Sequence, residues 1–310
     1  MAKRPKWWLV RPSTRAFYRE GRRTPGYSLL DFAHGYVYGR WVYQYLGAKP
    51  ASVFFRPFLS LGASLLALSA RKKTTETGHH PVADRYHGKV VPLDAAERLV
   101  TLDVGLELYG LEQVIPYPIA RDIMLKNPGH IVVIECPCGA GRVHPCLPVD
   151  VCIIVGEPFA SFIAEHHRTR SRWITQAEAV EILRAEHERG HVHHAFFKDA
   201  MLGRFYAICN CCSCCCGAME AFAHGVPMLA SSGYVSQLDA PSCVACGVCV
   251  EVCPFRALEM GETSVRVDEA RCMGCGVCVS KCPRGALSLV RDPKKGEPLD
   301  VRELVGSQAA

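Results

Sequence analysis

Two stretches near the end of the chain repeat each other: CVACGVCVEVCP at 243–254 and CMGCGVCVSKCP at 272–283. The copies are offset by 29 residues, and Cys243–Leu258 agrees with Cys272–Leu287 at ten of sixteen positions. Duplication of one short unit is the simplest explanation. Each copy reads C-x2-C-x2-C-x3-C-P, which wraps three thiols in a tight loop and carries a fourth on the turn that ends at proline.

This spacing is typical of cysteines that hold 4Fe-4S clusters, with the fourth cysteine of each run serving the other cluster. We therefore expect two such clusters. Their expected ligands are Cys243, Cys246, Cys249 and Cys282 for the first cluster, and Cys272, Cys275, Cys278 and Cys253 for the second. Zinc is the alternative, because C-x2-C pairs occur at 246/249 and 272/275. Zinc would leave the other four cysteines without a ligand role.

Glycines inside the two motifs fit the same interpretation. Gly247, Gly274 and Gly276 let backbone N–H groups approach the sulfurs closely, which offsets the negative charge of a thiolate-bound cluster. Through both complete motifs, this region resembles the two-cluster bacterial ferredoxins over about 55 residues. The resemblance implies a small ferredoxin-like domain at 236–291 that carries electrons through two 4Fe-4S clusters.

The chain has 18 cysteines among 310 residues, far more than an ordinary globular protein. Neighbours such as Cys214 and Cys215 are poor disulfide partners, because a bridge requires specific Cα separations and side-chain directions. No apolar signal-peptide core follows the basic N-terminal residues. We therefore interpret the cysteines as thiolate ligands in a reducing cytoplasm.

Ten of these cysteines lie upstream of the repeats, in the segments ECPCG-x-GR-x-HPC (135–146) and CNCCSCCC (209–216) and at Cys152. Side chains two residues apart on an extended chain share a face, so Cys136 is expected to pair with Cys138, Cys209 with Cys211, and Cys212 with both Cys214 and Cys216. One strand would then present thiols on two faces, and a single site could collect them all only through a sharp turn.

Our hypothesis is that these segments meet at the ends of adjacent strands and hold at least one further iron-sulfur cluster. Its candidate ligands are Cys136, Cys138, Cys146, Cys152, Cys209, Cys211, Cys212 and Cys214. The alternatives are a tetrahedral zinc site and buried or redox-active free thiols, including reversible sulfur chemistry at vicinal pairs. Arg142 is a candidate for hydrogen bonding to a cluster or for simple exposure.

The middle region also resembles the cysteine-rich domain that precedes ferredoxin modules in poorly characterised 4Fe-4S binding proteins of anaerobic bacteria and archaea. The stretches that carry the resemblance are ECPCG, VHPCLPVDVC, ITQAEAVEIL and ICNCCSCCCG. Together with the repeats, the two resemblances cover about residues 111–291. They imply an anaerobic redox setting and supply no ligand assignment for the middle cysteines.

Apolar runs at 131–136, 151–155 and 205–209 predict strands. A capping box at Thr175 and Glu178 begins a helix that ends at Gly190, and Ser28 with Asp31 begins another over 29–46. A further apolar run over 58–70 is too short to span a bilayer and suits an interfacial or packed helix.

The fold class expected from these elements is α+β or α/β: a ferredoxin-like domain appended to a cysteine-rich α/β domain with an N-terminal helical segment. The expected divisions are a basic arm with apolar helices at 1–92, ending in a linker from 71, the cysteine-rich domain at 93–235, the two-cluster domain at 236–291 and a polar, disordered tail at 292–310.

Positive charge is concentrated at the N-terminus, where residues 1–23 hold eight Lys or Arg and one Glu. Interleaved aromatic residues suggest peripheral contact of residues 1–73 with the cytoplasmic face of a membrane or with an acidic partner. A solvated basic tail is the alternative. Nucleic acid is not an expected partner, because no binding motif accompanies the charge.

The leading expectation is an electron carrier that relays single electrons between redox partner proteins as a subunit or adaptor. The rival is an iron-sulfur oxidoreductase with its catalytic site at CNCCSCCC. A DNA-binding regulator is disfavoured, because Glu178, Glu181, Glu186 and Glu188 make the Thr175 helix acidic and phosphate would be repelled. No nucleotide-binding glycine fingerprint occurs in the middle region.

Overall fold

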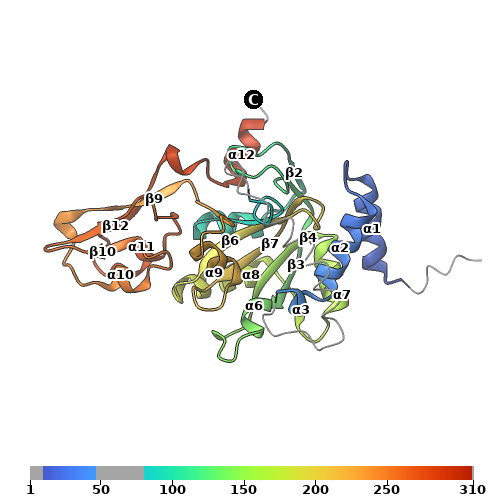
Figure 1. The fold of residues 1–310 in the computed structure, drawn as a ribbon, viewed down its shortest axis with the longest axis horizontal. Helices are drawn as coiled ribbons and strands as arrows, with labels where there is room; N and C mark the ends of the chain where they lie inside the picture. Colours follow the sequence, from blue (N-terminus) through green and yellow to red (C-terminus); the bar gives the residue numbers. More distant parts are fainter. Residues whose placement is uncertain (1–9, 47–79, 309–310) are drawn as a thin grey trace, which may run out of the picture.

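The computed structural model describes residues 10–46 and 80–308 (Figure 1). The apolar run at 58–70 and the first part of the expected linker lie outside the described residues. No helix within 10–46 and 80–308 combines the length and the apolar character needed to cross a membrane.

A curled eight-stranded sheet forms the centre of the molecule, in the order β2-β3-β4-β7-β6-β1-β8, with β5 paired to β3. Its strands are β1 (Tyr86–Val90), β2 (Leu106–Leu108), β3 (Ile123–Glu135), β4 (Asp150–Glu157), β5 (Ser171–Ile174), β6 (Val192–Lys198), β7 (Arg204–Cys211) and β8 (Leu229–Ala230). All neighbours are antiparallel except β1 and β8. The strands expected at 131–136, 151–155 and 205–209 are confirmed as parts of β3, β4 and β7.

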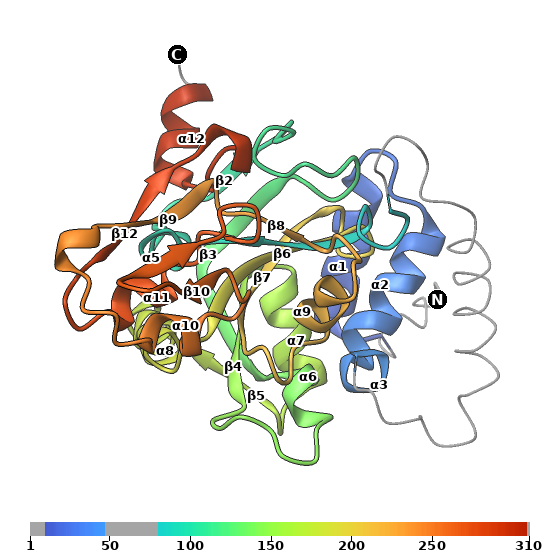
Figure 2. The same cartoon turned by 60° about the vertical axis from the view of Figure 1, so that its left-hand side comes forward.

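Helices cover the sheet on both faces. They are α1 (Pro12–Arg23), α2 (Leu29–Arg40), α3 (Val42–Leu46), α5 (Leu93–Val100), α6 (Pro137–Ala140), α7 (Phe159–His166), α8 (Gln176–Glu188) and α9 (Gly217–Ala223). Helices α1, α2 and α7 pack together on one side, while α5 and α8 pack together on the other (Figures 1 and 2). The N-terminal helices are therefore part of the fold, with Phe17 fully buried between Phe159 and Phe162.

Both expected capping boxes are present. Ser28 and Asp31 begin α2, and Thr175 and Glu178 begin α8, each with the reciprocal side-chain to backbone bonds of that motif. The helix expected over 29–46 is interrupted at Trp41, where the backbone leaves helical geometry, so that it forms α2 and the short α3.

A smaller cysteine-rich lobe follows β8. It contains β9 (Tyr234–Leu238), α10 (Val248–Val252), β10 (Leu258–Met260), β11 (Val265–Val267), α11 (Val277–Lys281) and β12 (Leu287–Arg291), with β9 paired to β12 and β10 to β11. Figure 1 shows this lobe beside the sheet, on the side away from α1 and α2. The mixed helix and strand content, the N-terminal helices and the small cysteine-rich lobe confirm the expected α+β class.

Two local expectations are wrong. The segment interpreted as a linker contains β1, because its His87 and Lys89 side chains are buried in the sheet despite their polarity. The expected disordered tail contains α12 (Val301–Gln308), and Leu299 and Val301 are buried in the main core. The Lys89 ammonium donates to the Glu297 carbonyl oxygen at 2.8 Å and ties this segment to β1. The domain boundaries themselves stay predictions.

The ligand loop of the second repeat packs against the segment between β8 and β9. Gly274 adopts a φ of 64°, and a Cβ added there would overlap Ser232 Oγ and the Tyr234 carbonyl oxygen. Ser232 in turn donates from Oγ to the Gly274 carbonyl oxygen at 2.8 Å. The equivalent position of the first repeat is Ala245, which tolerates a similar φ of 51°. Close packing, and not the turn alone, therefore requires glycine at 274.

We expect Gly274→Ala to lower the free energy of unfolding of the cluster-loaded protein by about 1–3 kcal/mol, since it adds overlap to left-handed strain. The matched change Ala245→Gly relieves the strain without creating a contact and should stay within about 1 kcal/mol of the parent. Denaturant unfolding under anaerobic conditions measures both changes. Equal effects at the two positions would contradict the packing explanation.

Candidate metal centres

The eight repeat cysteines gather around two small cavities in the lobe. Cys243, Cys246, Cys249 and Cys282 line one cavity. Cys253, Cys272, Cys275 and Cys278 line the other. The fourth cysteine of each motif thus lies with the first three of the other, which is the exchange that the spacing predicts. Their role as cluster ligands stays a prediction, and the sets fit that role in number and in residue type.

Backbone amides point at these sulfurs. Ala257 N–H donates to Cys253 Sγ at 3.3 Å, and its repeat equivalent Ala286 donates to Cys282 Sγ at 3.2 Å. Ser236 N–H donates to Cys272 Sγ at 3.4 Å. Such donors stabilise thiolate charge and tune a bound cluster. The amide positions therefore fit a negatively charged group in each cavity.

The two cavities differ in their surroundings. Cys246 of the first set is exposed, whereas Cys275 of the second set is buried in the main hydrophobic core with Met273 and Val277. Lys281 forms an ion pair of 2.8 Å with Glu188 of α8, which also joins the second repeat to the sheet domain. The second set faces the middle of the molecule, and the first set includes a thiol at the surface.

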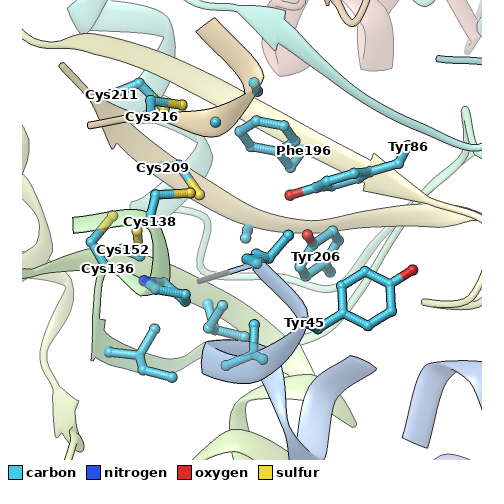
Figure 3. Close-up of a pocket in the computed structure, with 18 of the residues that line it drawn as sticks. Tyr45, Tyr86, Cys136, Cys138, Cys152, Phe196, Tyr206, Cys209, Cys211 and Cys216 are labelled. Carbon is cyan, nitrogen blue, oxygen red and sulfur yellow. The ribbon is translucent and has the colours of Figure 1, made fainter. Parts of the chain in front are cut away.

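Eight of the ten middle cysteines line one further cavity of about 310 Å³. Two of them, Cys212 and Cys215, also belong to a second group described below, and we call the other six the inner thiols: Cys136, Cys138, Cys152, Cys209, Cys211 and Cys216 (Figure 3). Cys209 and Cys211 share one face of β7, as alternation predicts, while Asn210 faces the opposite side and donates to the Val151 carbonyl oxygen at 2.7 Å.

The inner thiols come from four elements that end at the same edge of the fold. Cys152 lies on β4 and Cys209 on the neighbouring β7. Cys136 caps the short helix α6, which carries Cys138, and Cys216 caps α9. The strand ends therefore meet as we expected from the sequence.

Contacts between the inner thiols shift their protonation. Hydrogen bonds from Cys136 and then Cys216 lower the pKa of Cys138, and a hydrogen bond from Cys216 followed by the charge of His194 lowers the pKa of Cys211. Hydrogen bonds with Cys138 and Cys211, followed by burial, raise the pKa of Cys216 in turn. Thiolates are the form that binds metals. The cavity thus contains many soft sulfur donors, and the lowered pKa values of Cys138 and Cys211 favour the thiolate form of these two.

The other end of this cavity is aromatic. Tyr38, Tyr45, Tyr86, Phe196 and Tyr206 line it, and Figure 3 labels the last four. The Tyr38 and Tyr206 hydroxyls are 2.7 Å apart. The Lys198 ammonium, itself buried, lies 4.6 Å from the centre of the Tyr86 ring. Burial raises the pKa of Tyr45 to about 12, so its hydroxyl stays protonated at neutral pH.

The remaining four cysteines form a separate group. Cys146, Cys212, Cys214 and Cys215, which we call the outer thiols, have sulfur atoms that all lie within 4.8 Å of one another. Cys212 does lie with Cys214, but on a turn and not on an extended strand. Cys216 does not join them, because the chain turns after Cys211 and Cys216 returns to the cavity. The eight expected middle ligands are thus divided between two groups.

Two cysteines that our ligand set omitted, Cys215 and Cys216, belong to these groups. The alternation of side chains could not assign them, since it applies only while the chain is extended. Arg142 is fixed near the outer thiols: it donates to the Cys215 carbonyl oxygen at 3.2 Å and forms an ion pair of 2.6 Å with Glu220. His193 and His194 lie in β6, where both side chains are buried.

Comparison with known families identifies part of the lobe. A family model described as a 4Fe-4S dicluster domain matches residues 242–286. No match to the chain was found among curated proteins. The matched residues contain all eight repeat cysteines, and the cysteine groups of the middle region lie outside the match. The chain is therefore an iron-sulfur protein with a 4Fe-4S dicluster domain near its C-terminus.

Double variants test the exchange of the fourth cysteines. We expect Cys246→Ser alone and the pair Cys246→Ser with Cys282→Ser each to lose about four irons per chain, because both changes remove ligands of one cluster. The pair Cys246→Ser with Cys253→Ser should lose about eight, because it disables both clusters. Iron and acid-labile sulfide analysis of anaerobically purified protein distinguishes these outcomes. Loss of about eight irons in the pair Cys246→Ser with Cys282→Ser, and of about four in the pair Cys246→Ser with Cys253→Ser, would show that each motif serves its own cluster.

Proposed function

We propose that the chain relays single electrons from a redox partner through the two 4Fe-4S clusters of the lobe to the inner thiols, as a subunit or adaptor of an anaerobic redox system. The observation that carries the proposal is the unequal burial of the two cysteine sets. Electrons enter at the set that includes exposed Cys246 and leave through the set whose Cys275 lies in the main core.

The surface around Cys246 suits a redox partner protein. Val244 is 58% exposed and Met260 is 47% exposed, and both lie beside the first cysteine set. A small apolar patch beside a near-surface cluster permits a transient complex with a short distance for electron transfer. Membrane contact through residues 1–73 is a separate proposal that this patch does not require.

A packed path connects the second set to the inner thiols. A Cβ built on Gly276 would lie 4.0 Å from His187 Cε1 at the end of α8. The His187 ring stacks on the His193 ring with centroids 5.5 Å apart. His193 Nδ1 lies 2.6 Å from Asn210 Oδ1, and Asn210 separates Cys209 from Cys211 in β7. Burial lowers the pKa of His193 to about 3, so the path carries no fixed charge at neutral pH.

The inner thiols supply the endpoint of this path. A 4Fe-4S cluster, when bound, supplies reversible one-electron chemistry, and four of the six thiols suffice to hold one. A hydrogen bond from Cys216 lowers the pKa of Cys211, which favours the thiolate form that binds metals. Cys152, Cys211 and Cys216 are buried, and burial of the ligands shifts the potential of a bound cluster.

The aromatic end of the cavity favours a second candidate function, an iron-sulfur oxidoreductase. Four tyrosines and Phe196 leave apolar space next to the inner thiols, where a small organic substrate could lie beside a cluster. A cluster with an open iron position would bind added cyanide and change its electron paramagnetic resonance spectrum. Turnover of a substrate by the isolated chain would also favour this enzyme over the relay.

Metal counting tests the proposed endpoint. We expect anaerobically purified protein to hold about twelve acid-labile sulfides per chain, eight from the lobe and four from the cavity. Cys152→Ser, Cys209→Ser and Cys211→Ser combined should remove about four irons and four sulfides, because only three of the inner thiols then remain. Tyr206→Phe, a change in the same cavity that removes no thiol, should keep these irons and sulfides. Eight sulfides in the parent protein would contradict an additional cluster.

A further inference from the structure

The outer thiols bring together two loops that are distant in the sequence. Cys146 lies on the loop before β4, and Cys214 lies 68 positions later on the turn after β7, yet their sulfurs are 3.2 Å apart. Cys214 Sγ is 3.6 Å from Cys215 Sγ. Cys212 completes a group in which every pair of sulfurs is within 4.8 Å.

The spacing of these sulfurs distinguishes between a cluster and a single ion. A tetrahedral ion with metal–sulfur bonds of about 2.3 Å places its thiolates roughly 3.8 Å apart. A cubane binds each thiolate to a different iron, so its thiolates stand further apart. Within the residues that the structure describes, neither dicluster set gathers three thiols as closely as the outer thiols do.

We propose that Cys146, Cys212, Cys214 and Cys215 bind one tetrahedrally coordinated metal ion, zinc or iron(II), and not a 4Fe-4S cluster. The proposal concerns thiols outside the relay and does not depend on a cluster at the inner thiols. Four soft sulfur donors with no carboxylate or imidazole among them are the donor set of closed tetrathiolate sites.

Local structure holds the four donors in place. After β7 the chain makes a turn closed by a bond of 3.2 Å from Cys216 N–H to the Cys212 carbonyl oxygen. Arg142 reaches from the other loop to the Cys215 carbonyl oxygen, and its charge offsets part of the negative charge of four thiolates around a divalent ion. Polar contacts therefore align the two loops independently of the sulfurs.

The position of this ion gives it a structural role at the rim of the inner cavity. Cys212 and Cys215 also line the inner cavity, so the ion lies at the cavity rim. One of the two loops that the ion joins follows α6, which carries Cys138. The other leads into α9, which begins after its N-cap residue Cys216. Binding free energy at such a site contributes to folding free energy. The ion thus locks the rim that positions two of the inner thiols.

Metal and sulfide analysis of the full chain tests this site. We expect Cys214→Ser, at an exposed position, to lose one zinc or one iron per chain with no change in acid-labile sulfide. Cys146→Ser should behave in the same way, while Ser213→Ala, in the same turn, should keep the ion. Cobalt(II) added to metal-depleted outer thiols should give the intense visible bands of tetrahedral thiolate coordination, and these bands should be absent in Cys214→Ser.

Other outcomes would overturn the proposal. Loss of about four irons together with four sulfides in Cys214→Ser would show a cluster at the outer thiols. An unchanged metal content in Cys214→Ser, or a Cys146–Cys214 disulfide found by mass spectrometry of protein alkylated anaerobically, would show that no ion is held there. If Cys146→Ser does not fold, the metal content of Cys214→Ser and the cobalt spectrum of the parent chain still show whether the outer thiols bind an ion.

Discussion

The alternation of side chains along β7 is the constraint on which the arrangement of this molecule depends. Cys209 and Cys211 point to one face of the sheet, and Asn210 between them points to the other. The thiols therefore share a cavity with the N-terminal helices, while the amide contacts the side that carries α8 and the dicluster lobe. A single strand thus lies between the inner thiols and the side of the sheet that faces the dicluster lobe.

The sequence permits accurate prediction where local chemistry decides the structure. The capping boxes at Ser28 and Thr175 require only residues three positions apart, and both helices begin there. The cysteine repeats fix their own loops through spacing, and the exchange of fourth cysteines between the two groups follows from the duplication. Apolar runs at 131–136 and 205–209 identified central strands because both faces of those strands are buried.

Tertiary structure decides the features that could not be predicted. The run CNCCSCCC gives no indication of where the strand ends, so the division of its thiols between two sites depends on the turn after Cys211. Strand β1 carries His87 and Lys89, whose polarity resembles that of a loop, and only its neighbours β6 and β8 bury them. The contact of Leu299 and Val301 with the main core likewise joins distant parts of the chain.

The turn after β7 also explains how one cysteine-rich segment can serve two kinds of chemistry. Thiols on the strands touch one another in pairs, such as Cys152 with Cys209, but among the described residues no three of the inner thiols gather as closely as the outer thiols do. Thiols on the turn are drawn together to within 4.8 Å, which suits one ion and leaves no space for a cubane. Sulfur spacing, which the backbone of the strand and of the turn sets, is therefore the physical basis on which we propose different metal groups for adjacent cysteines.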